Sequence, residues 1–564
     1  MCKCRNGNLA QMSSIQDHIS AAIVQILESS RDFLGCEIPS HITLDRPKNR
    51  DHGDYATSIA LALAKPSGKS PRDIAQIVQK GLSELPEVAQ VDIAGPGFIN
   101  ITLAKSSQGE VVASIFRQVD KYGHSTTMSG VSVNLEFVSA NPTGPLHLGH
   151  TRWAAVGDAL GRLLSATGAS VTREFYVNDR GNQMELFGAS IRAAALGKAR
   201  PEEGYHGAYI EDIAKEIVAL HPEVLTLEGE AAVSAFRDYG YALQLKDQQR
   251  VLDDLGTHFD VWFSEKSLFE NDFFNHSLEK LRQQGHVFEL DGATWLRTTD
   301  YGDDKDRVII KSDGSFAYFA ADSAYYINKR ERGFDICIYM LGADHHGYVG
   351  RLKAIAACAG DDPEYNIHVL IGQMVKIMEG GEELKLSKRA GTIITLEELV
   401  EKVGVDAARY TLIRYPVDTP MVMDVDVLRS RTNENPVYYV QYAHARICAV
   451  LRNASDLGIT YGSDFAAEYE LLEHHREREL MGLLGEFPKV VSGAADLREP
   501  HRIARYVEEL AGVYHRFYND CRVLPMGDEP AEPIHSARAN LCLATAQVVA
   551  NGLALLGVSA PERM

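Results

Sequence analysis

A strand, a turn and a helix follow one another between residues 131 and 168, and this order restricts the fold more than any other feature of the chain. Apolar and polar residues alternate in VSVNLEFV (131–138), which predicts a strand. The next segment, NPTGPLHLGH (141–150), contains two prolines and two glycines and therefore predicts a turn. Apolar residues at helical spacing then predict a helix that ends near Gly168. Alternation of strands and helices is typical of a doubly wound parallel sheet.

His147 and His150 lie where this helix is expected to begin. Ligands usually bind at the carboxyl ends of strands in an open α/β sheet, and the free N–H groups of a helix start favour anions. Two imidazoles three residues apart can both donate hydrogen bonds to one polyphosphate, and Gly149 lets a flat base approach the backbone. A lone His-x-x-His is more often an ordinary helix start. The strand, turn and helix around this one favour a phosphate site.

The length of 564 residues predicts about three or four domains. We divide the chain into a disordered extension or misplaced start at 1–11, an α+β module at 12–120, a Rossmann-type parallel-sheet domain at 121–425 with a helical insertion at about 195–290, and a helical bundle at 426–564. After the insertion, ATWLR (293–297) and RVIIKS (307–312) are expected to resume the parallel sheet. The chain is therefore predicted to be multidomain, part α/β and part α.

Composition excludes some classes of protein. No apolar run approaches the roughly 20 residues that span a bilayer, and the polar start is no signal peptide, so we expect a cytoplasmic protein without a membrane partner. The eight cysteines lack zinc spacing, which predicts reduced thiols and no structural zinc or other bound metal. The net charge of −20 argues against a nucleic-acid partner, although a local basic groove is compatible with it.

A second candidate motif is KLSKRAGT (385–392), in which Lys385 and Lys388 flank Ser387. A loop rich in cations can fold over a polyphosphate and neutralise the charge that develops as pyrophosphate leaves. Taken alone, the same residues are more often a solvated basic turn. The motif gains weight because it follows the histidine motif along one alternating α/β pattern.

A third candidate group is acidic. Glu136 lies on the polar face of the first strand, Asn141 follows it, and Tyr318 and Asp322 are four residues apart on one predicted helix face. Carboxylates beside a phosphate site suit a second, cationic substrate, because a planar guanidinium pairs with carboxylates in bidentate fashion. Taken singly, each carboxylate is more often a structural ion-pair partner.

The last segment of the chain predicts helices only. Apolar residues step by four and three along one of them and predict the core face of a bundle: Ile503, Val507, Leu510, Tyr514 and Phe517. In another, Tyr438 and Tyr442 with Arg446 could stack on unpaired RNA bases. Core packing is the commoner role of aromatic residues at helical spacing, so both interpretations stay open for the tyrosines.

HLGH and KLSK resemble the His-Ile-Gly-His and Lys-Met-Ser-Lys signatures of class I aminoacyl-tRNA synthetases. From about residue 12 to the end the chain resembles the arginyl-tRNA synthetase family. That assignment rests on further segments: EFVSANPTGPLHLGH, YVNDRGNQ, YHGAYIEDIA, FDVWFSEKSL, GADHHGYVGRL, DAARY, YVQYAHAR and LGVSAPERM, with HGDYATSIAL and IAGPGFINI near the start. The second signature is often degenerate in this family, whereas both lysines are present here.

The resemblance implies an arginine–tRNA ligase that acts in protein biosynthesis. Such an enzyme forms arginyl-adenylate and pyrophosphate from L-arginine and ATP, and then transfers arginine to the terminal adenosine of its tRNA and releases AMP. The resemblance further implies that the N-terminal module contacts the tRNA corner, that the bundle binds the anticodon, and that activation needs bound tRNA. We expect Mg²⁺ to accompany ATP as substrate, no tightly bound cofactor, and a monomer.

Carried over by position, the resemblance also assigns residues. Arginine would be bound by Glu136, Asn141, Tyr318 and Asp322, with His346 and Gln373 matched less closely. ATP would be bound by Pro145, His147, Gly149, His150, Lys385, Ser387 and Lys388, and the two histidines and two lysines would be catalytic. The tRNA would be contacted by Tyr438, Tyr442 and Arg446.

Three alternatives compete with this interpretation. A synthetase for glutamate or cysteine is disfavoured by the paired carboxylates and by the missing zinc-type cysteine cluster. A nucleotidylyltransferase that ignores tRNA would share both phosphate motifs but has no use for the C-terminal bundle. A noncatalytic tRNA-binding paralogue would not need the intact histidines and lysines of both signatures.

Overall fold

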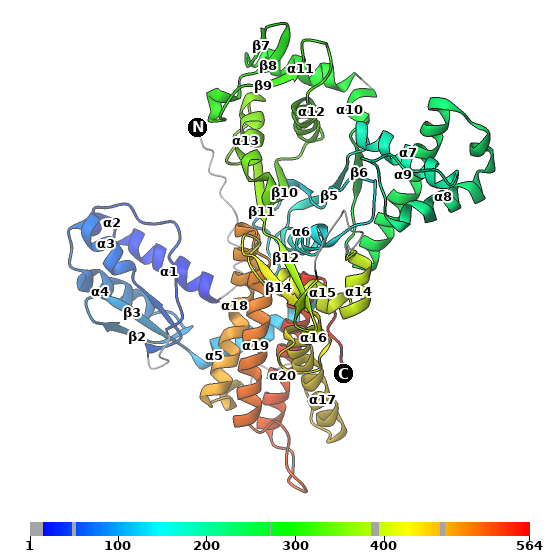
Figure 1. Cartoon of the computed structure of the whole chain (residues 1–564). Helices are drawn as coiled ribbons and strands as arrows, with labels where there is room; N and C mark the ends of the chain where they lie inside the picture. The colour runs from blue at the N-terminus through cyan, green and yellow to red at the C-terminus, as the bar shows by residue number, and fades with distance from the viewer. Residues whose placement is uncertain (1–14, 48–51, 271, 385–393, 463–468) are drawn as a thin grey trace.

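The computed structural model describes residues 15–47, 52–270, 272–384, 394–462 and 469–564. Two sequence predictions therefore lie outside the described residues: the extension at 1–11, and the lysine motif with Lys385, Ser387 and Lys388. Figure 1 shows an N-terminal module on the left, a central α/β body that carries two lobes at the top and right, and a helical bundle below. This arrangement is the predicted combination of α/β and α architecture.

The N-terminal module is an α+β unit with its own hydrophobic core, which extends from Ile19 to Leu103. Its elements are α1 (Ile15–Ser29), α2 (Arg31–Leu34), β1 (Tyr55–Thr57), α3 (Ile59–Ser67), α4 (Pro71–Leu82), β2 (Val88–Ala94) and β3 (Phe98–Leu103). The strands are antiparallel in the order β1-β3-β2. Gly95 and Gly97, with φ of 54° and 147°, form the tight turn predicted before β3. An ion pair of 2.8 Å between Arg46 and Glu486 joins the module to the bundle.

The central sheet has the strand order β11-β10-β4-β5-β6, and every neighbouring pair is parallel. Its strands are β4 (Ser132–Glu136), β5 (Ser170–Val177), β6 (Val261–Ser264), β10 (Ile336–Gly342) and β11 (Ile367–Gly372). The predicted strand, turn and helix are β4, the loop 137–147 and α6 (Leu148–Ala166), and Gly168 follows the helix with a φ of 94°. The sheet is therefore the predicted Rossmann-type sheet.

Both faces of β4 are buried, although the alternation predicted one apolar and one polar face. Val133 and Leu135 pack in the core with α6. On the other face Asn134 and Glu136 are also buried, since α12 (Tyr318–Glu331) covers that side and its Lys329 contacts Glu136. Helices on both faces are the rule for a parallel sheet, so the polar residues of β4 mark an internal site rather than a wet surface.

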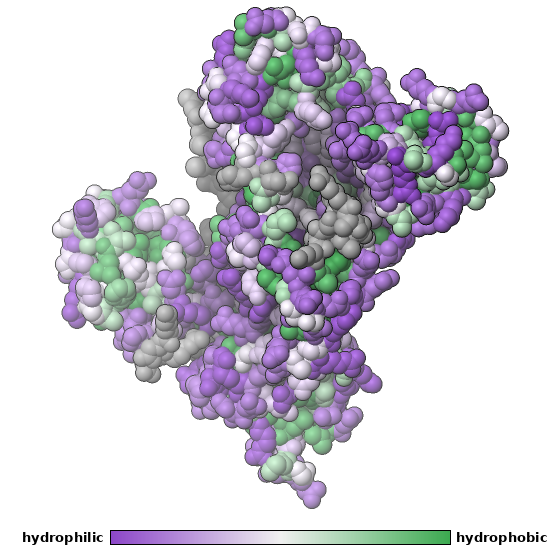
Figure 2. Space-filling view, viewed as in Figure 1, coloured by the Kyte–Doolittle hydropathy of each residue, from purple (hydrophilic) through white to green (hydrophobic). Residues whose placement is uncertain are grey.

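Two lobes extend from the sheet. The first consists of α7 (Asn182–Ala195), α8 (Ala208–Leu220) and α9 (Gly229–Asp254), which share a separate core. The second contains α10 (Ser267–Glu270), α11 (Phe273–Gln283), β7 (Val287–Leu290), β8 (Ala293–Leu296) and β9 (Arg307–Ile310). Figure 2 shows that the surface is hollowed between these lobes.

Two sequence predictions about this region were wrong. The stretch 195–290 is not one helical insertion, because β6 within it returns to the central sheet. ATWLR and RVIIKS are β8 and β9, but they belong to a separate antiparallel sheet of order β7-β8-β9. The physical reason is local: Asp291 and Gly292, with φ of 52° and 75°, form a two-residue hairpin turn between β7 and β8. A tight hairpin makes neighbouring strands antiparallel.

The remaining elements connect the sheet to the bundle. They are α13 (Val349–Cys358), β12 (Val375–Glu379), β13 (Glu382–Glu383), α14 (Leu396–Val403), α15 (Val405–Ile413), β14 (Met421–Asp424) and α16 (Val425–Arg429). The bundle consists of α17 (Pro436–Asp456), α18 (His475–Leu497), α19 (His501–Asp520) and α20 (Pro533–Leu556). The predicted core face of α19 is buried. The sequence places residues 105–118 in the N-terminal module, but in the structure they form α5 (Lys105–Gln118), which packs against α18 and α20.

Within the described residues, α20 is long and apolar enough to cross a membrane. Its most apolar window is 78% buried inside the protein. The helix packs against α17, α18 and α19 and contributes many of the buried side chains of the bundle. The bundle core therefore accounts for its composition.

Candidate active site

The two histidines of the first motif cap α6. His147 is the residue before the helix, and its Nδ1 accepts a hydrogen bond of 3.1 Å from the Gly149 N–H. The Nδ1 of His150 accepts a bond of 3.3 Å from the His147 N–H, and the two rings lie 4.1 Å apart. Because each Nδ1 is an acceptor, each neutral ring carries its proton on Nε2. The helix start therefore holds two imidazole N–H donors side by side.

The chain that follows the lysine motif lies against this helix start. The Leu148 N–H donates to the Ile394 carbonyl (3.3 Å), and the Leu396 N–H donates to the Leu146 carbonyl (3.0 Å). Thr395 between them pairs with His147 in an antiparallel bridge and caps α14. The two motifs are far apart in sequence, but the described residues that follow the second contact the first directly.

The helical lobe supports the turn between β4 and α6. The Gln248 side chain in α9 donates to the carbonyls of Asn141 and Gly144 at 3.1 and 2.9 Å. The Tyr209 hydroxyl in α8 donates to the Thr143 carbonyl at 2.9 Å. The turn itself departs from ordinary backbone geometry, because Val138 has a φ of 69°. A β-branched residue in the left-handed region is strained, and such strain is typical of functional sites.

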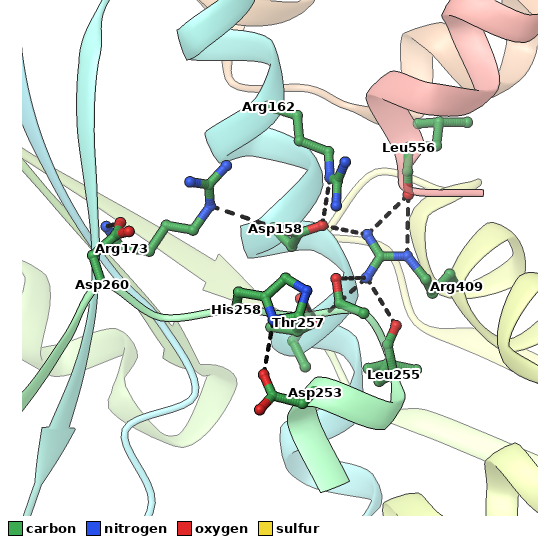
Figure 3. A network of polar contacts seen from close by, with 12 residues as sticks. Asp158, Arg162, Arg173, Asp253, Leu255, Thr257, His258, Asp260, Arg409 and Leu556 are labelled. Carbon is green, nitrogen blue, oxygen red and sulfur yellow. Dashed lines mark hydrogen bonds and ion pairs between the residues drawn. The ribbon is translucent and has the colours of Figure 1, made fainter. Parts of the chain in front are cut away.

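Figure 3 shows what holds α6 in place. Arg409 of α15 is fully buried, and its guanidinium binds Asp158 of α6 at 2.6 Å. It also donates to the carbonyl of Leu255, after α9, and to that of Leu556, at the end of α20. Burial lowers the pKa of Arg409 and the charge of Asp158 opposes that shift. One side chain thus joins the histidine helix, the helical lobe and the bundle.

Asp322, Glu265 and Glu136 form a cluster of carboxylates whose charges act on one another. Asp322 lies in the first turn and a half of α12 and accepts a hydrogen bond from the Tyr348 hydroxyl. The pKa of Asp322 is raised to about 7: burial is the largest cause, the charges of Glu265 and Glu136 add to it, and Tyr348 and Arg351 oppose it. The charges of three carboxylates therefore act on one another here.

Glu265 is a site residue that the sequence interpretation missed. Burial raises its pKa, whereas Arg180, at 4.0 Å, and a hydrogen bond from Tyr176 oppose the shift. Burial also raises the pKa of Tyr176 well above its ordinary value, with added effects of Glu265, Asp322 and Glu136. Glu265 directly follows β6, and a residue at the carboxyl end of a sheet strand could have been proposed on that ground alone.

The surroundings of Glu136 differ from those expected of a residue that binds the arginine substrate. Its Oε2 lies 2.6 Å from the Nζ of Lys329, and its Oε1 accepts a bond of 3.1 Å from the Ser139 hydroxyl. The carboxylate thus already has a cation of the protein as its partner. Glu136 lies close enough to influence Asp322 and Tyr176, but it does not need a substrate cation to balance its charge.

The other predicted arginine ligands are less closely gathered. The Asn141 amide donates to the Gln183 side chain, and the Tyr318 side chain is 96% exposed at the start of α12. Gln373 follows β11, its backbone N–H donates to the Val417 carbonyl, and it lines a pocket of about 700 Å³ that reaches the turn between α18 and α19. The side chain of His346 lies outside the described part of the chain.

The predicted tRNA contacts lie on α17. The rings of Tyr438 and Tyr442 are stacked at 5.9 Å and 13°, and Tyr442 is 39% exposed. Arg446, one turn further, lies 4.3 Å from the ring centre of Tyr518. Tyr438 and Tyr442 present an aromatic surface, whereas Arg446 is engaged within the bundle. Within the described residues, no group of three or more His, Cys, Asp or Glu side chains could hold a metal ion.

Comparison with known families matches three successive parts of the chain. Residues 13–103 match the family described as arginyl tRNA synthetase N terminal domain, and residues 111–443 match the catalytic domain of class I (R) tRNA synthetases. Residues 440–564 match the DALR anticodon binding domain.

Individual relatives support the same family as the domain matches. The chain is 54% identical to an arginine–tRNA ligase of Frankia alni over 98% of its own length and 100% of the relative. An arginyl-tRNA synthetase structure from Campylobacter jejuni has a TM-score of 0.73 at 32% identity, with 82% of this chain and 100% of that chain covered. The Thermus thermophilus arginyl-tRNA synthetase shares the fold, with a TM-score of 0.74 at 22% identity over 98% of this chain and all of that one. With two histidines at a strand-to-helix turn, a cluster of carboxylates in the same α/β domain and a helical bundle after it, the chain belongs to the arginyl-tRNA synthetase family of class I aminoacyl-tRNA synthetases.

Proposed function

We propose that this chain is an arginine–tRNA ligase whose cluster of carboxylates binds L-arginine beside an ATP site at the start of α6. The observation that carries the assignment is the group of carboxylates Asp322, Glu265 and Glu136, in which burial and the charges of the two glutamates raise the pKa of Asp322. A desolvated cluster of carboxylates is unfavourable unless a cation joins it. The guanidinium and α-ammonium groups of arginine are two such cations, and an acidic amino acid has no comparable group in its side chain.

In the first step the arginine carboxylate attacks the α-phosphorus of ATP. A carbon-bound oxygen becomes bonded to phosphorus, the bond to the β-phosphate breaks, and pyrophosphate leaves with the electron pair. We assign the phosphates to the Nε2–H groups of His147 and His150, and the base to Gly149 and Pro145. Lys385, Ser387 and Lys388, which lie outside the described residues, would neutralise the departing pyrophosphate, and Mg²⁺ would accompany ATP as substrate.

In the second step a ribose hydroxyl of the terminal adenosine of tRNA attacks the arginyl carbonyl, and AMP leaves. No covalent bond to the protein is needed, so positioning and charge stabilisation account for the catalysis. We assign Asp322 and Glu265 to the positive groups of arginine. Asn141, Tyr318, His346 and Gln373 keep their supporting roles from the resemblance.

The tRNA would extend from the α6 start to the bundle. The exposed stack of Tyr438 and Tyr442 supports a contact with unpaired anticodon bases, since each stacked base contributes about 1–3 kcal/mol. We propose the limits 121–425 for the catalytic domain and 426–564 for the bundle, and we place the N-terminal module, which ends before α5, at the tRNA corner. We further propose that the protein acts as a monomer in the cytoplasm.

The test is aminoacylation of total tRNA with each amino acid in turn. Arginine should be the efficient substrate, and lysine should be poor because its ammonium lacks the planar fork of a guanidinium. Lys388→Ala should lower turnover about a hundredfold and leave arginine binding nearly intact, because the charge it meets develops as pyrophosphate departs. Unchanged single-turnover activation in that variant would refute the role of Lys388.

ATP–pyrophosphate exchange separates the competing activities. We expect exchange to require tRNA for arginine. Exchange without RNA, together with no aminoacylation of any tRNA, would favour a nucleotidylyltransferase. Binding of tRNA with neither activity would favour a noncatalytic paralogue.

A further inference from the structure

A cavity of about 700 Å³ lies between the edge of the central sheet and the turn that joins α18 to α19. β11 is the outermost strand of the sheet on this side, and its residues 369–371 line the cavity together with residues 497–501 of the turn. Among the described residues that line it, Gln373 is shared with the proposed substrate site, whereas His147 and Asp322 are absent. The volume is typical of a site for a small molecule.

The walls of the cavity are largely aliphatic, with contributions from β11, the start of α13 and the loop 415–418. Two carboxylates also line it, and each has a cation of the protein beside it. Glu499 pairs with Arg502. The charge of Asp418 acts on the buried Arg152 of α6, whose guanidinium donates to carbonyl groups of the same loop. The cavity therefore offers an apolar surface, and its acidic groups are already engaged.

Arg498 is the cation of this cavity that lacks a carboxylate partner. It forms no ion pair with any described residue; its Nη1 donates to the Asp496 carbonyl at 2.9 Å, and its Nε is buried without a hydrogen-bond partner. Burial lowers the pKa of Arg498, and the charge of the exposed Asp496 opposes the shift. A buried guanidinium N–H without an acceptor is unfavourable, and an anion in the cavity would satisfy it.

The charge of Arg498 acts on a neighbour in β11. The pKa of His368 is lowered to about 4: burial is the largest cause, and the charges of Arg498 and Lys353 add to it. A histidine that lies near an unneutralised cation loses its proton more easily. His368 therefore shows independently that the positive charge of Arg498 is not cancelled inside the protein.

The backbone at Arg498 is also unusual. Arg498 directly follows α18 and has a φ of 59° and a ψ of 42°, in the left-handed region. Glycine is the common residue at this position of a helix end, because it adopts the conformation without strain. A non-glycine residue that keeps such a conformation is typical of a functional site.

We propose that this cavity binds a small organic anion, whose acidic group meets the Arg498 guanidinium and whose apolar body lies against β11 and the start of α13. A carboxylate or a phosphate presents two oxygens to the planar fork of a guanidinium. The ligand would contact the catalytic domain and the bundle together. This site is additional to the proposed arginine and ATP sites.

The experiment uses two probes of the same shape, naphthalene-1-acetate and its neutral amide naphthalene-1-acetamide, in equilibrium dialysis with the full-length protein at neutral pH. The carboxylate should bind about ten- to a hundredfold more tightly than the amide, since a hydrogen bond to a charged group is involved. Arg498→Gly should remove this difference and leave thermal stability equal or higher, because glycine relieves the backbone strain. A less stable Arg498→Gly protein that keeps the difference would make Arg498 structural and overturn the proposal.

A second variant fills the cavity and does not depend on Arg498. A Cβ added at Gly350, which lines the cavity at the start of α13, meets no atom within 4 Å. Gly350→Phe should therefore lose binding of both probes. Gly493→Phe is the matched control, because Gly493 of α18 has equally open space and does not line the cavity. Its binding of both probes should be unchanged.

Competition distinguishes this site from the others. Saturating L-arginine or ATP should leave the bound carboxylate in place, and displacement by either would assign the cavity to the substrate site. Displacement by total tRNA would assign the charge of Arg498 to an RNA phosphate. Each of these results would overturn the proposal, as would equal binding of the two probes to the unmodified protein.

Discussion

Two clusters of charged side chains lie within the catalytic region, and they are built in opposite ways. In the first, Asp158 is 2% exposed and meets three cations: Arg409, Arg162 and Arg173. In the second, the charges of Asp322, Glu265 and Glu136 act on one another. The first cluster gathers three cations around one carboxylate, whereas the second gathers three carboxylates, with Lys329 on Glu136, Arg180 at 4.0 Å from Glu265, and Arg351 acting on Asp322.

The difference between the two clusters corresponds to a difference in role: the Asp158 cluster holds the fold together, and the Asp322 cluster is the proposed substrate site. The Asp158 carboxylate is paired on every side by guanidinium groups, and the cluster holds α6, the helical lobe and the bundle together without a ligand. The Asp322 cluster is unfavourable by itself, and a fold retains such a cluster where a ligand supplies the missing charge. The arrangement of acidic groups is therefore the reason to propose the Asp322 cluster, and not the Asp158 cluster, as the substrate site.

The sign of the Asp322 shift has a consequence for stability. The pKa of Asp322 is raised from 3.8 to about 7 in the folded protein, so the folded state binds a proton that the unfolded state releases. The contribution of this group to the free energy of unfolding is therefore present at acidic pH and is lost as pH rises from about 4 to about 7. Arginine binding should restore it, because the guanidinium favours the ionised carboxylate.

The largest effect is expected from Arg409→Met, which breaks the Asp158 cluster. The substitution leaves the Asp158 carboxylate without its closest buried partner and three carbonyl groups without their donor. Removing one member of a buried pair costs about 3–5 kcal/mol. Chemical unfolding should show that loss, and Arg409→Lys should lose less. Normal stability combined with weakened arginine binding would mean that this cluster is part of the site.

The second effect is expected from Asp322→Asn, which acts on the Asp322 cluster. The KM for arginine should rise more than a hundredfold, because about 3–5 kcal/mol is lost when a desolvated charge loses its partner, and the KM for ATP should shift only a few-fold. The free energy of unfolding without arginine should stay the same or increase at pH 8. Steady-state kinetics and unfolding of the same preparation check both. A large loss of stability would make Asp322 a scaffold residue.

A smaller effect is expected from pH alone. Because arginine binds the ionised form of Asp322, the KM for arginine in the unmodified enzyme should fall about tenfold between pH 6 and pH 8. Asp322→Asn should show a flat profile over the same range. Measurement of the KM at constant ionic strength tests this, and a KM that rises with pH would contradict the assignment.

The smallest effect is expected from Arg162→Met. Arg162 binds Asp158 at 2.7 Å in the Asp158 cluster, but its side chain is 36% exposed, and exposed ion pairs contribute about 0–1 kcal/mol. Chemical unfolding should therefore show less than about 1 kcal/mol, far below the loss in Arg409→Met. Equal losses in the two variants would show that burial does not set the difference between these arginines.

Much of the fold could be predicted from the sequence because its signals are local. The alternation before residue 138 and the helical spacing after it identified β4 and α6, and the spacing in residues 503–517 identified the core face of α19. The wrong placement of β8 also has a local cause, since Asp291 and Gly292 form the hairpin turn that joins β8 to β7 and separates it from the central sheet. The family followed from motifs that the comparisons support.

What the sequence by itself determined is therefore the order of elements, the histidine turn and the family. Only the tertiary structure decided which cations lie beside the carboxylates. Glu136 pairs with a lysine 193 residues away, and Asp158 pairs with an arginine 251 residues away. Periodicity reports which face of an element is buried, because that depends on neighbours along the chain. The balance of charge in a pocket depends on distances between segments that only the folded chain brings together, so Glu136 and Asp322 looked alike in the sequence and differ in the protein.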